Sequence, residues 1–311
     1  MPSRRSHPSR RDFLTAAGGL AAASLAAPAR SLAVDSGWID AHVHIWTPDL
    51  ERYPLAAGRE REDMRPPSFT AGELLAEAQP HGVTRVVLIQ MSFYRYDNTY
   101  MLDAIAAHPG VFSGVAIIDE DGPDVPMTMQ TLGARGVRGF RLHTGKDHAA
   151  SWIDSEGIRT MWKTGAETRQ AMCCLANPEA LPAIGRMCQA FPETPVVIDH
   201  FARIGASGQI PESEVEQLLR LADHPTVHVK TSAFYALGQK AAPYTDLAPF
   251  ILRLRDAYGP ERLMWATDCP YQVQKGHTYG ESIALVRDRI PELSDMDKAW
   301  ILRGTAEKVF F

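Results

Sequence analysis

Three histidines and one aspartate lie where their side chains could together hold a metal ion or act on one small molecule. His42 and His44 are separated by one residue, in the run 40–44 (DAHVH). His200 ends the run VVIDH, and Asp268 ends the run LMWATD. Imidazoles and carboxylates are common zinc ligands, and a carboxylate can also take a proton from water as a general base. The alternative is that the histidines are structural residues, hydrogen-bonded within a core.

Positively charged side chains accompany these candidates. Arg141 and His143 alternate at the end of the run VRGFRLH, so they share one face of an extended strand. Arg203 comes three residues after the third histidine, and Lys230 and Ser232 add donors further along. A guanidinium group binds a carboxylate or an oxyanion through paired donors. We therefore expect the two arginines to contact a substrate, with a surface ion pair as the alternative for either one.

The candidate residues belong to short β-rich runs that alternate with helical patterns. Such an alternation predicts a parallel sheet with right-handed crossovers. Eight strands close a (β/α)8 TIM barrel of a single domain, whose typical length is about 250 residues. A doubly wound open sheet is the alternative, but no G-x-G-x-x-G motif follows the first run. The predicted strands are 38–45, 85–90, 112–119, 137–143, 172–177, 196–200, 227–234 and 263–268.

Helical spacing of apolar residues fills most of the intervals. The segment 70–79 has Thr70 and Glu73 three residues apart at its start, which predicts a capping box. The proline- and charge-rich segment 47–68 predicts a long loop after the first strand, where a barrel would carry a cover for its active site. The other predicted helices are 98–107, 161–169, 182–190, 212–221 and 247–257.

Strict alternation along a strand predicts which side chains point into the barrel. His42 and His44 share a face, and the apolar residues between and beside them suit the layer of helices. By the same alternation, His200 shares a face with Val196 and Ile198. Asp268 shares one with residues 264 and 266. All four candidates are therefore expected to point inward, at the carboxyl ends of the strands.

The first 33 residues have the order of an export signal. An arginine pair, Arg10-Arg11, precedes Phe13-Leu14, a small-residue apolar run follows, and Ser31-Leu32-Ala33 is a plausible cleavage site. This order resembles a twin-arginine signal, with a basic or amphipathic tail as the alternative. We expect residues 1–33 to be the signal and 34–311 to be the barrel. The protein would then be periplasmic or secreted, with the twin-arginine machinery as partner of the precursor.

Composition excludes other classes of protein. The 311 residues are 45% hydrophobic and 22% charged with a net charge of −5, which leaves no broad nucleic-acid footprint. No apolar run approaches the roughly 20 residues of a membrane span. The four cysteines contain no C-x-x-C pair, so buried free thiols are favoured over a disulfide framework.

Five motifs in order resemble the amidohydrolase-related (amidohydrolase 2) family of TIM-barrel hydrolases. A terminal segment, 305–310 (TAEKVF), resembles the family's last helix. Within the family, the chain is most similar to the branch of pyrone-dicarboxylate and sugar lactonases. The branch with two metals uses a carboxylated lysine at the end of the fourth strand. Here Lys146 falls in the loop beyond that strand, so a second metal is not expected. The motifs are DAHVHIW (40–46), GVRGFRLH (136–143), VVIDHFAR (196–203), VKTSAFY (229–235) and MWATDCP (264–270).

The resemblance implies a hydrolase that opens a lactone or similar cyclic ester. Asp268 would activate water, with His200 as a second catalytic residue. One divalent ion, zinc or manganese, would be bound by His42, His44, His200 and Asp268. The branch also includes metal-independent members, in which the same histidines would polarise the carbonyl by hydrogen bonds.

The expected partner is a small molecule that carries carboxyl or hydroxyl groups. Arg141, His143 and Arg203 would bind those groups, and Trp46 and Tyr235 would form walls of the pocket. Two alternatives use the same residues differently. A metal-dependent decarboxylase would grip a ring carboxylate, and a non-catalytic periplasmic binding protein would use the pocket without a reaction.

Overall fold

The computed structural model describes residues 37–144 and 146–311, which fall within one compact unit, Ala33–Phe311. The predicted export signal, 1–33, lies outside the described residues. No helix of the described part is both long enough and apolar enough to cross a bilayer. All four cysteines are buried free thiols, as predicted.

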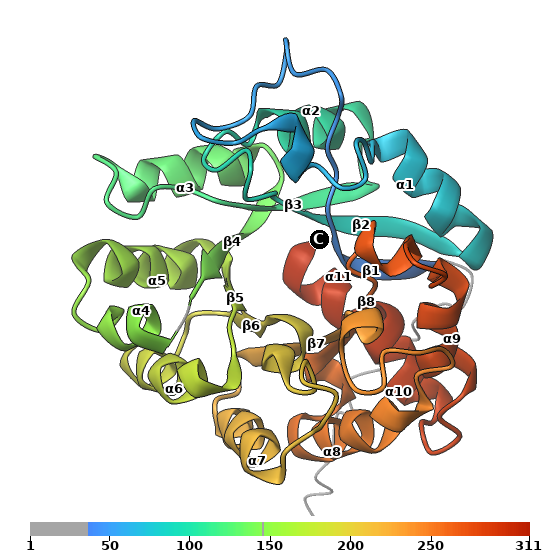
Figure 1. The fold of residues 1–311 in the computed structure, drawn as a ribbon. Coiled ribbons are helices and arrows are strands. Elements are labelled where there is room, and N and C mark those ends of the chain that lie inside the picture. Colours follow the sequence, from blue (N-terminus) through green and yellow to red (C-terminus); the bar gives the residue numbers. More distant parts are fainter. Residues whose placement is uncertain (1–36, 145) are drawn as a thin grey trace, which may run out of the picture. The chain divides into compact units, whose positions relative to one another are not determined.

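Eight parallel strands form one sheet in the order of the sequence, which confirms the predicted TIM barrel (Figure 1). A parallel bridge between Val43 and Cys269 joins the first strand to the segment after the last. The open-sheet alternative is thereby wrong. The strands are β1 (Trp38–Val43), β2 (Val83–Ile89), β3 (Phe112–Ala116), β4 (Val137–His143), β5 (Ala171–Leu175), β6 (Val196–Ile198), β7 (Val227–Ser232) and β8 (Leu263–Ala266).

Helices surround the strands on the outside (Figure 1). Thr70 and Glu73 form the predicted capping box at the start of the first of them, and Asp124, Ser155 and Thr278 cap later helices through their side chains. The helices are α1 (Ala71–Ala78), α2 (Thr99–Ala107), α3 (Val125–Ala134), α4 (Lys146–Ser151), α5 (Glu156–Thr168), α6 (Leu181–Ala190), α7 (Glu212–Arg220), α8 (Ala248–Tyr258), α9 (Tyr279–Asp288), α10 (Asp295–Ala299) and α11 (Thr305–Phe310).

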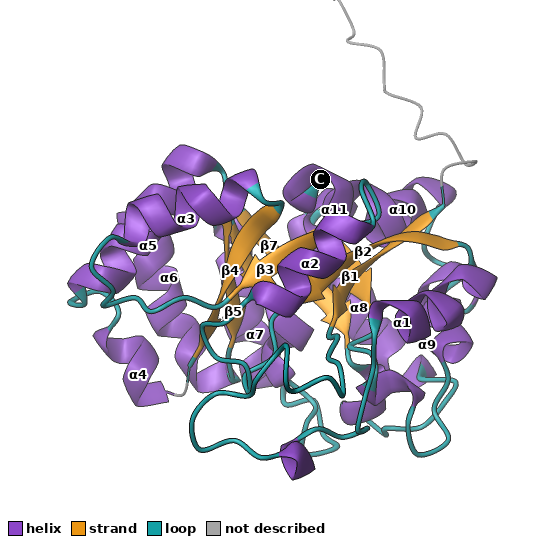
Figure 2. Cartoon of the chain, turned by 90° about the horizontal axis from the view of Figure 1, so that it is seen from above, coloured by secondary structure: helices purple, strands orange, loops and turns teal. Residues whose placement is uncertain are grey.

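Two apolar clusters separate the inside of the barrel from the layer of helices. The inner cluster takes side chains from six strands and from Ala306 and Phe310 of α11. In Figure 2, α11 lies at the end of the barrel opposite the long loops. Cys173 belongs to the inner cluster and Cys174 to the outer one, as alternation along β5 requires.

Several strands end earlier than the sequence pattern predicts. β1 ends at Val43, β6 at Ile198 and β8 at Ala266. His44, His200 and Asp268 therefore lie in the turns that follow the strands. The backbone leaves the sheet at these residues. The turns that it enters direct the three side chains toward a shared point.

Asp40 fastens β1 to the end of β8. Its buried carboxylate accepts hydrogen bonds from the backbone N–H and hydroxyl of Thr267 and, at 2.7 Å, from the hydroxyl of Tyr279 in α9. Burial raises the pKa of Asp40 to about 6, although these hydrogen bonds oppose the rise. The cluster holds the neighbouring residues of both strand ends, including His42, in place.

Asp40→Asn is expected to lower the free energy of unfolding by about 2 kcal/mol, because the new amide N–H₂ faces donors that then lack an acceptor. Urea denaturation of the variant and of the parent protein measures the difference. Exposed Asp154 offers a matched control, and Asp154→Asn is expected to change stability by less than about 0.5 kcal/mol. Equal losses in both variants would contradict a fastening role for Asp40.

Candidate active site

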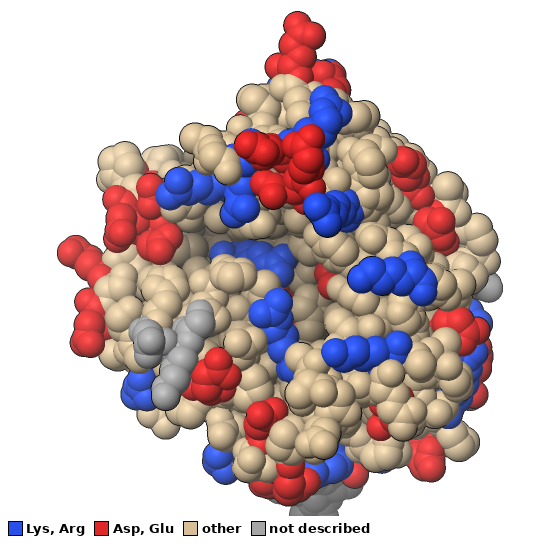
Figure 3. Space-filling model, in the orientation of Figure 1, with Lys and Arg blue, Asp and Glu red and all other residues tan. Residues whose placement is uncertain are grey.

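A cavity of about 540 Å³ opens at the carboxyl ends of the strands. Figure 3 shows a hollow on this face of the molecule, with lysine and arginine side chains in and around it. The lining includes most of the candidates from the sequence. No residue of the loop 47–68 is among the residues that line the cavity. The predicted residues that line it are His44, Arg141, His143, His200, Arg203, Tyr235 and Asp268.

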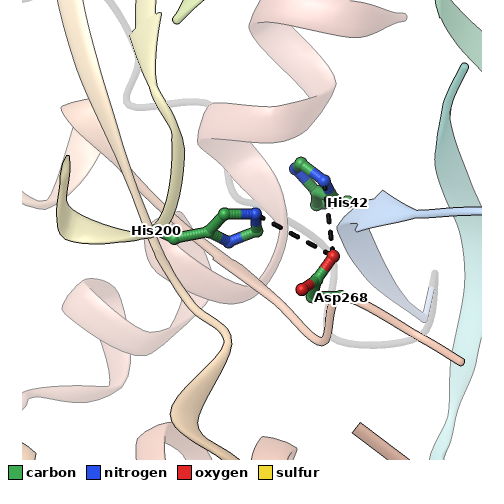
Figure 4. Close-up of side chains that lie close together, drawn as sticks. All are labelled: His42, His200 and Asp268. Carbon is green, nitrogen blue, oxygen red and sulfur yellow. Dashed lines mark ion pairs between the residues drawn. The ribbon is translucent and has the colours of Figure 1, made fainter. Parts of the chain in front are cut away.

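Asp268 lies at the centre of the histidine group. Its Oδ1 atom is 3.3 Å from Nε2 of His44, 3.6 Å from Nε2 of His42 and 3.9 Å from Nε2 of His200. Figure 4 shows the rings of His42 and His200 next to each other, both facing the carboxylate of Asp268. The four predicted ligands therefore converge, although they come from three separate strand ends.

His42 reaches the inside of the barrel through an irregularity in β1. Strict alternation would send Ala41 outward, but Ala41 packs in the inner cluster together with Ile39. The register between β1 and β2 shifts between Asp40 and Val43. Such a bulge re-aims side chains, so His42 also turns inward. The expectation that Ala41 faces the helices is thus wrong.

His200 also reaches the site against strict alternation. Val196 and Ile198 pack in the outer cluster, so the expectation that they share an inward face with His200 is wrong. The residues from His200 to Arg203 all have positive φ, between 51° and 59°. This conformation is unfavourable for residues other than glycine, and it is a feature often found at functional sites. The left-handed turn carries His200 into the site and Arg203 to its rim.

Hydrogen bonds to the outer ring nitrogens define the tautomers of two histidines. Nδ1 of His44 lies 2.8 Å from the carbonyl oxygen of Ile89, which can only accept. Nδ1 of His200 lies 2.8 Å from the hydroxyl of Ser232, which itself donates to the carbonyl of Lys230. In its neutral form each of these rings therefore carries the proton on Nδ1 and presents the lone pair of Nε2 to the site.

His42 has two outer partners of opposite character. Nδ1 of His42 lies 3.2 Å from Nζ of Lys230 and 3.4 Å from Oδ1 of Asp199. Lys230 and Asp199 form an ion pair at 3.0 Å, and both side chains are fully buried. The sequence identified Lys230 only as a further donor and missed Asp199. Asp199 could have been found from the sequence, because it is a charged residue next to His200 in an otherwise apolar run.

Burial keeps the rings of His42 and His200 uncharged. It lowers the pKa of His200 to about 4, and it lowers the pKa of His42 well below the ordinary value, an effect that Lys230 increases. Burial alone would raise the pKa of Asp268, but His200 and the other two histidines hold that pKa below its usual range. At neutral pH the site therefore contains the ionised carboxylate of Asp268 beside the neutral imidazoles of His42 and His200.

Aromatic side chains support the carboxylate and the cavity wall. The hydroxyl of Tyr235 donates to Oδ2 of Asp268 at 2.6 Å, so Tyr235 does more than form a wall. Trp46 does not line the cavity; it is buried and packs at 6.2 Å from the ring of Tyr271. Tyr271, which sequence reasoning missed, lines the cavity in its place.

The rim of the cavity is positively charged. Arg141 approaches Nε2 of His44 at 3.4 Å, and Arg203 contacts the amide oxygen of Asn177 at 3.4 Å. No carboxylate among the described residues forms an ion pair with either guanidinium. Burial, with Arg141 and Arg203 nearby, lowers the pKa of His143. Two uncompensated cations beside a neutral imidazole form a site for an anionic group.

Comparisons with known proteins agree with this architecture. The sequence profile of the family described as amidohydrolase matches residues 39–311. A 4-sulfomuconolactone hydrolase of Rhizobium radiobacter is 27% identical over 78% of each chain. An L-fucono-1,5-lactonase of Burkholderia ambifaria is 28% identical over 79% of this chain and 85% of the relative.

A solved structure has the same fold. It is an amidohydrolase from Burkholderia multivorans with bound zinc, which superposes with a TM-score of 0.71 over 88% of this chain and 98% of its own, at 19% identity. The fold, the arrangement of strand ends and the family match lead to one conclusion. The chain belongs to the amidohydrolase family, and it is a hydrolase.

Proposed function

We propose that this protein hydrolyses a lactone or similar cyclic ester that carries an anionic group. The position of Asp268 supports this proposal most directly. Its Oδ1 faces the histidines, and its Oδ2 accepts a hydrogen bond from the hydroxyl of Tyr235. Asp268 and Tyr235 both line a cavity whose rim holds Arg141 and Arg203, and neither arginine forms an ion pair within the described part of the chain. The two relatives named above act on lactones, which supports this substrate class.

The reaction follows from these positions. Arg141 and Arg203 hold a carboxylate of the substrate, which brings the lactone carbonyl toward the histidines. Asp268 takes a proton from water, and the oxygen of that water attacks the carbonyl carbon. The ring C–O bond then breaks as the tetrahedral intermediate collapses. Asp268 returns the proton to the departing ring oxygen, which leaves a hydroxy acid as product.

The donor set fits one divalent cation, zinc or manganese. Nε2 of His44, Nε2 of His200 and Oδ1 of Asp268 direct lone pairs toward a shared point. The possible ligand atoms of His42, His200 and Asp268 all lie within 4.8 Å of one another. His44 and His200 also donate from Nδ1 to outer partners that orient their rings, a usual feature of metal ligands. His42, His44, His200 and Asp268 would hold the ion, which would polarise the substrate carbonyl.

A screen of matched substrates tests the proposal. Lactones with and without a carboxylate are incubated with the purified protein beside carboxylated aromatic compounds, and acid production and CO₂ release are recorded. Hydrolysis of the carboxylated lactones without CO₂ is the expected result. Release of CO₂ would identify the decarboxylase alternative, and tight binding without any product would identify the binding protein.

Tyr235→Phe is expected to lower kcat by about 10- to 100-fold with little change in KM. The lost hydrogen bond goes to an ionised group, and such bonds contribute about 1.5–3 kcal/mol. Steady-state kinetics on a responsive lactone measures the effect. Tyr96→Phe removes a hydroxyl from an exposed ring and serves as the control. A normal kcat in Tyr235→Phe would show that the hydroxyl does not position Asp268.

We further propose that residues 1–33 form a twin-arginine export signal, which makes the mature protein periplasmic or secreted. The support is the order of the arginine pair, the apolar run and the small residues before Ala33. Arg10→Lys together with Arg11→Lys is expected to keep the protein in the cytoplasm. Mass spectrometry of the exported protein locates the cleavage, and unchanged export of the variant would contradict this proposal.

A further inference from the structure

The side chain of Lys230 is buried inside the barrel, directly behind His42. It is 0% exposed, its Nζ lies 3.0 Å from Oδ1 of Asp199, and it approaches the ring of Phe310 in α11 at 5.4 Å. Burial of an ion pair costs solvation energy, and an apolar pair of similar volume is often as stable. The stability of the core therefore does not account for a lysine at this position.

Lys230 makes a directed contact with the ring of His42. An ammonium group has donors and no acceptor, so at the 3.2 Å contact Nδ1 of His42 must accept. An imidazole whose Nδ1 accepts a hydrogen bond carries no proton on that nitrogen, so the ring of His42 is neutral. A neutral ring has one N–H, so its proton then lies on Nε2, the nitrogen that faces the site.

The inner side of His42 agrees with this assignment. Nε2 of His42 lies 3.3 Å from Nε2 of His44, which presents a lone pair because its Nδ1–H donates to the carbonyl of Ile89. A proton on Nε2 of His42 lets one imidazole donate to the other. With the opposite tautomer, the two lone pairs would face each other. The hydrogen bonds thus run in one direction from Lys230 through His42 and His44 to Ile89.

Asp199 favours the other tautomer, but its geometry is poorer. Its Oδ1 is 3.4 Å from Nδ1 of His42, whereas Nζ of Lys230 is 3.2 Å from the same nitrogen. The two charges therefore compete for one ring nitrogen. Lys230 has the closer and better-directed contact.

We propose that Lys230 is a positioning residue that holds His42 as the Nε2–H tautomer and so weakens divalent-metal binding at the site. In this tautomer His42 donates a hydrogen bond toward the cavity and has no lone pair there for a metal. A cation could gain His42 as a ligand only after the imidazole proton moved from Nε2 to Nδ1. The new Nδ1–H would then donate a hydrogen bond to the carboxylate of Asp199. The inference concerns the proposed active site, but it makes no assumption about the substrate.

The tautomer can be measured directly in the metal-free protein. Long-range ¹H–¹⁵N NMR distinguishes the protonated from the unprotonated nitrogen of each imidazole, and the spectrum of His42→Gln identifies the signals of His42. A proton on Nε2 of His42 in the parent protein is the expected result. A proton on Nδ1 would overturn the proposal. This measurement requires no substitution of Lys230 and no substrate.

The effect on metal binding requires a variant without a net change of buried charge. Lys230→Met combined with Asp199→Asn removes both charges and leaves an amide oxygen that can accept from Nδ1 of His42. We expect the proton of His42 to move to Nδ1 and the dissociation constant for Zn²⁺ to fall at least about 10-fold, the usual size of effects from outer partners of metal ligands. Calorimetric titration with Zn²⁺ measures the dissociation constant.

Lys163→Met removes an exposed lysine of α5 and is the matched control, with no change in Zn²⁺ affinity expected. Circular dichroism establishes that each variant is folded. An unchanged Zn²⁺ affinity in the folded double variant would overturn the proposed role of Lys230. Neither readout depends on catalysis, so the absence of lactone hydrolysis would contradict the proposed function and leave this inference standing.

Discussion

Asp268→Asn is expected to lower kcat for lactone hydrolysis by about 1,000-fold. An amide has the same shape as the carboxylate but cannot take a proton from water, and general-base catalysis contributes about 100- to 10,000-fold. The substrate-binding arginines remain, so KM should change by less than about threefold. Steady-state kinetics with a responsive lactone gives both constants.

Two measurements separate loss of the base from loss of the fold. The thermal midpoint of Asp268→Asn should stay close to that of the parent protein, and Asp154→Asn should retain full activity because Asp154 is exposed and does not line the cavity. A variant at position 268 that stays folded and hydrolyses the lactone at the normal rate would exclude Asp268 as the base. Another group would then have to activate water.

Arg141→Met is expected to lower kcat/KM for a carboxylated lactone by about 100-fold. The guanidinium has no carboxylate partner among the described residues and lines the cavity, so it is available to bind an anion. Hydrogen bonds to charged groups contribute about 1.5–3 kcal/mol each, and about 1.4 kcal/mol corresponds to tenfold. A guanidinium can donate two such hydrogen bonds to one carboxylate. Water in the open cavity competes for both groups, so we expect the loss of kcat/KM to lie near the lower end of the range for two bonds.

The methyl ester of the same lactone provides the internal control, because it lacks the anion. Its kcat/KM should change by less than about threefold in Arg141→Met. Arg138 lies on the same strand but bonds to the backbone carbonyls of Gly133 and Val137, so Arg138→Met removes an equal charge outside the cavity. Equal losses for the acid and the ester would indicate that Arg141 acts on the reacting centre instead of the carboxylate.

Much of the fold was predictable, because the pattern of apolar residues is set by local geometry. Alternating β-rich and helical runs led to the correct barrel and to eight strands in the right places. Val137–His143 was correct at both ends, and the capping box of Thr70 and Glu73 was correct in detail. These features depend on residues close in sequence, so a sequence pattern contains them.

The orientation of the site residues was predicted for the wrong reason. Alternation brought His42 and His200 to the inside in the prediction, whereas a register shift in β1 and a left-handed turn after β6 bring them there in the structure. Both irregularities arise where the chain leaves the sheet. A period of two no longer applies at that point, because the backbone is not extended.

The pattern of residues along the chain was enough to predict the barrel and the chemical groups at its strand ends: three imidazoles, one carboxylate and two guanidinium groups. The tertiary structure decided how those groups are protonated and paired. Lys230 is 188 residues from His42 in sequence, yet the closed barrel brings their side chains to 3.2 Å. The hydroxyl of Tyr235 reaches Asp268 across 33 residues of sequence. Tautomers, pKa values and unpaired charges depend on neighbours in space and on burial, and only the closed barrel supplies both.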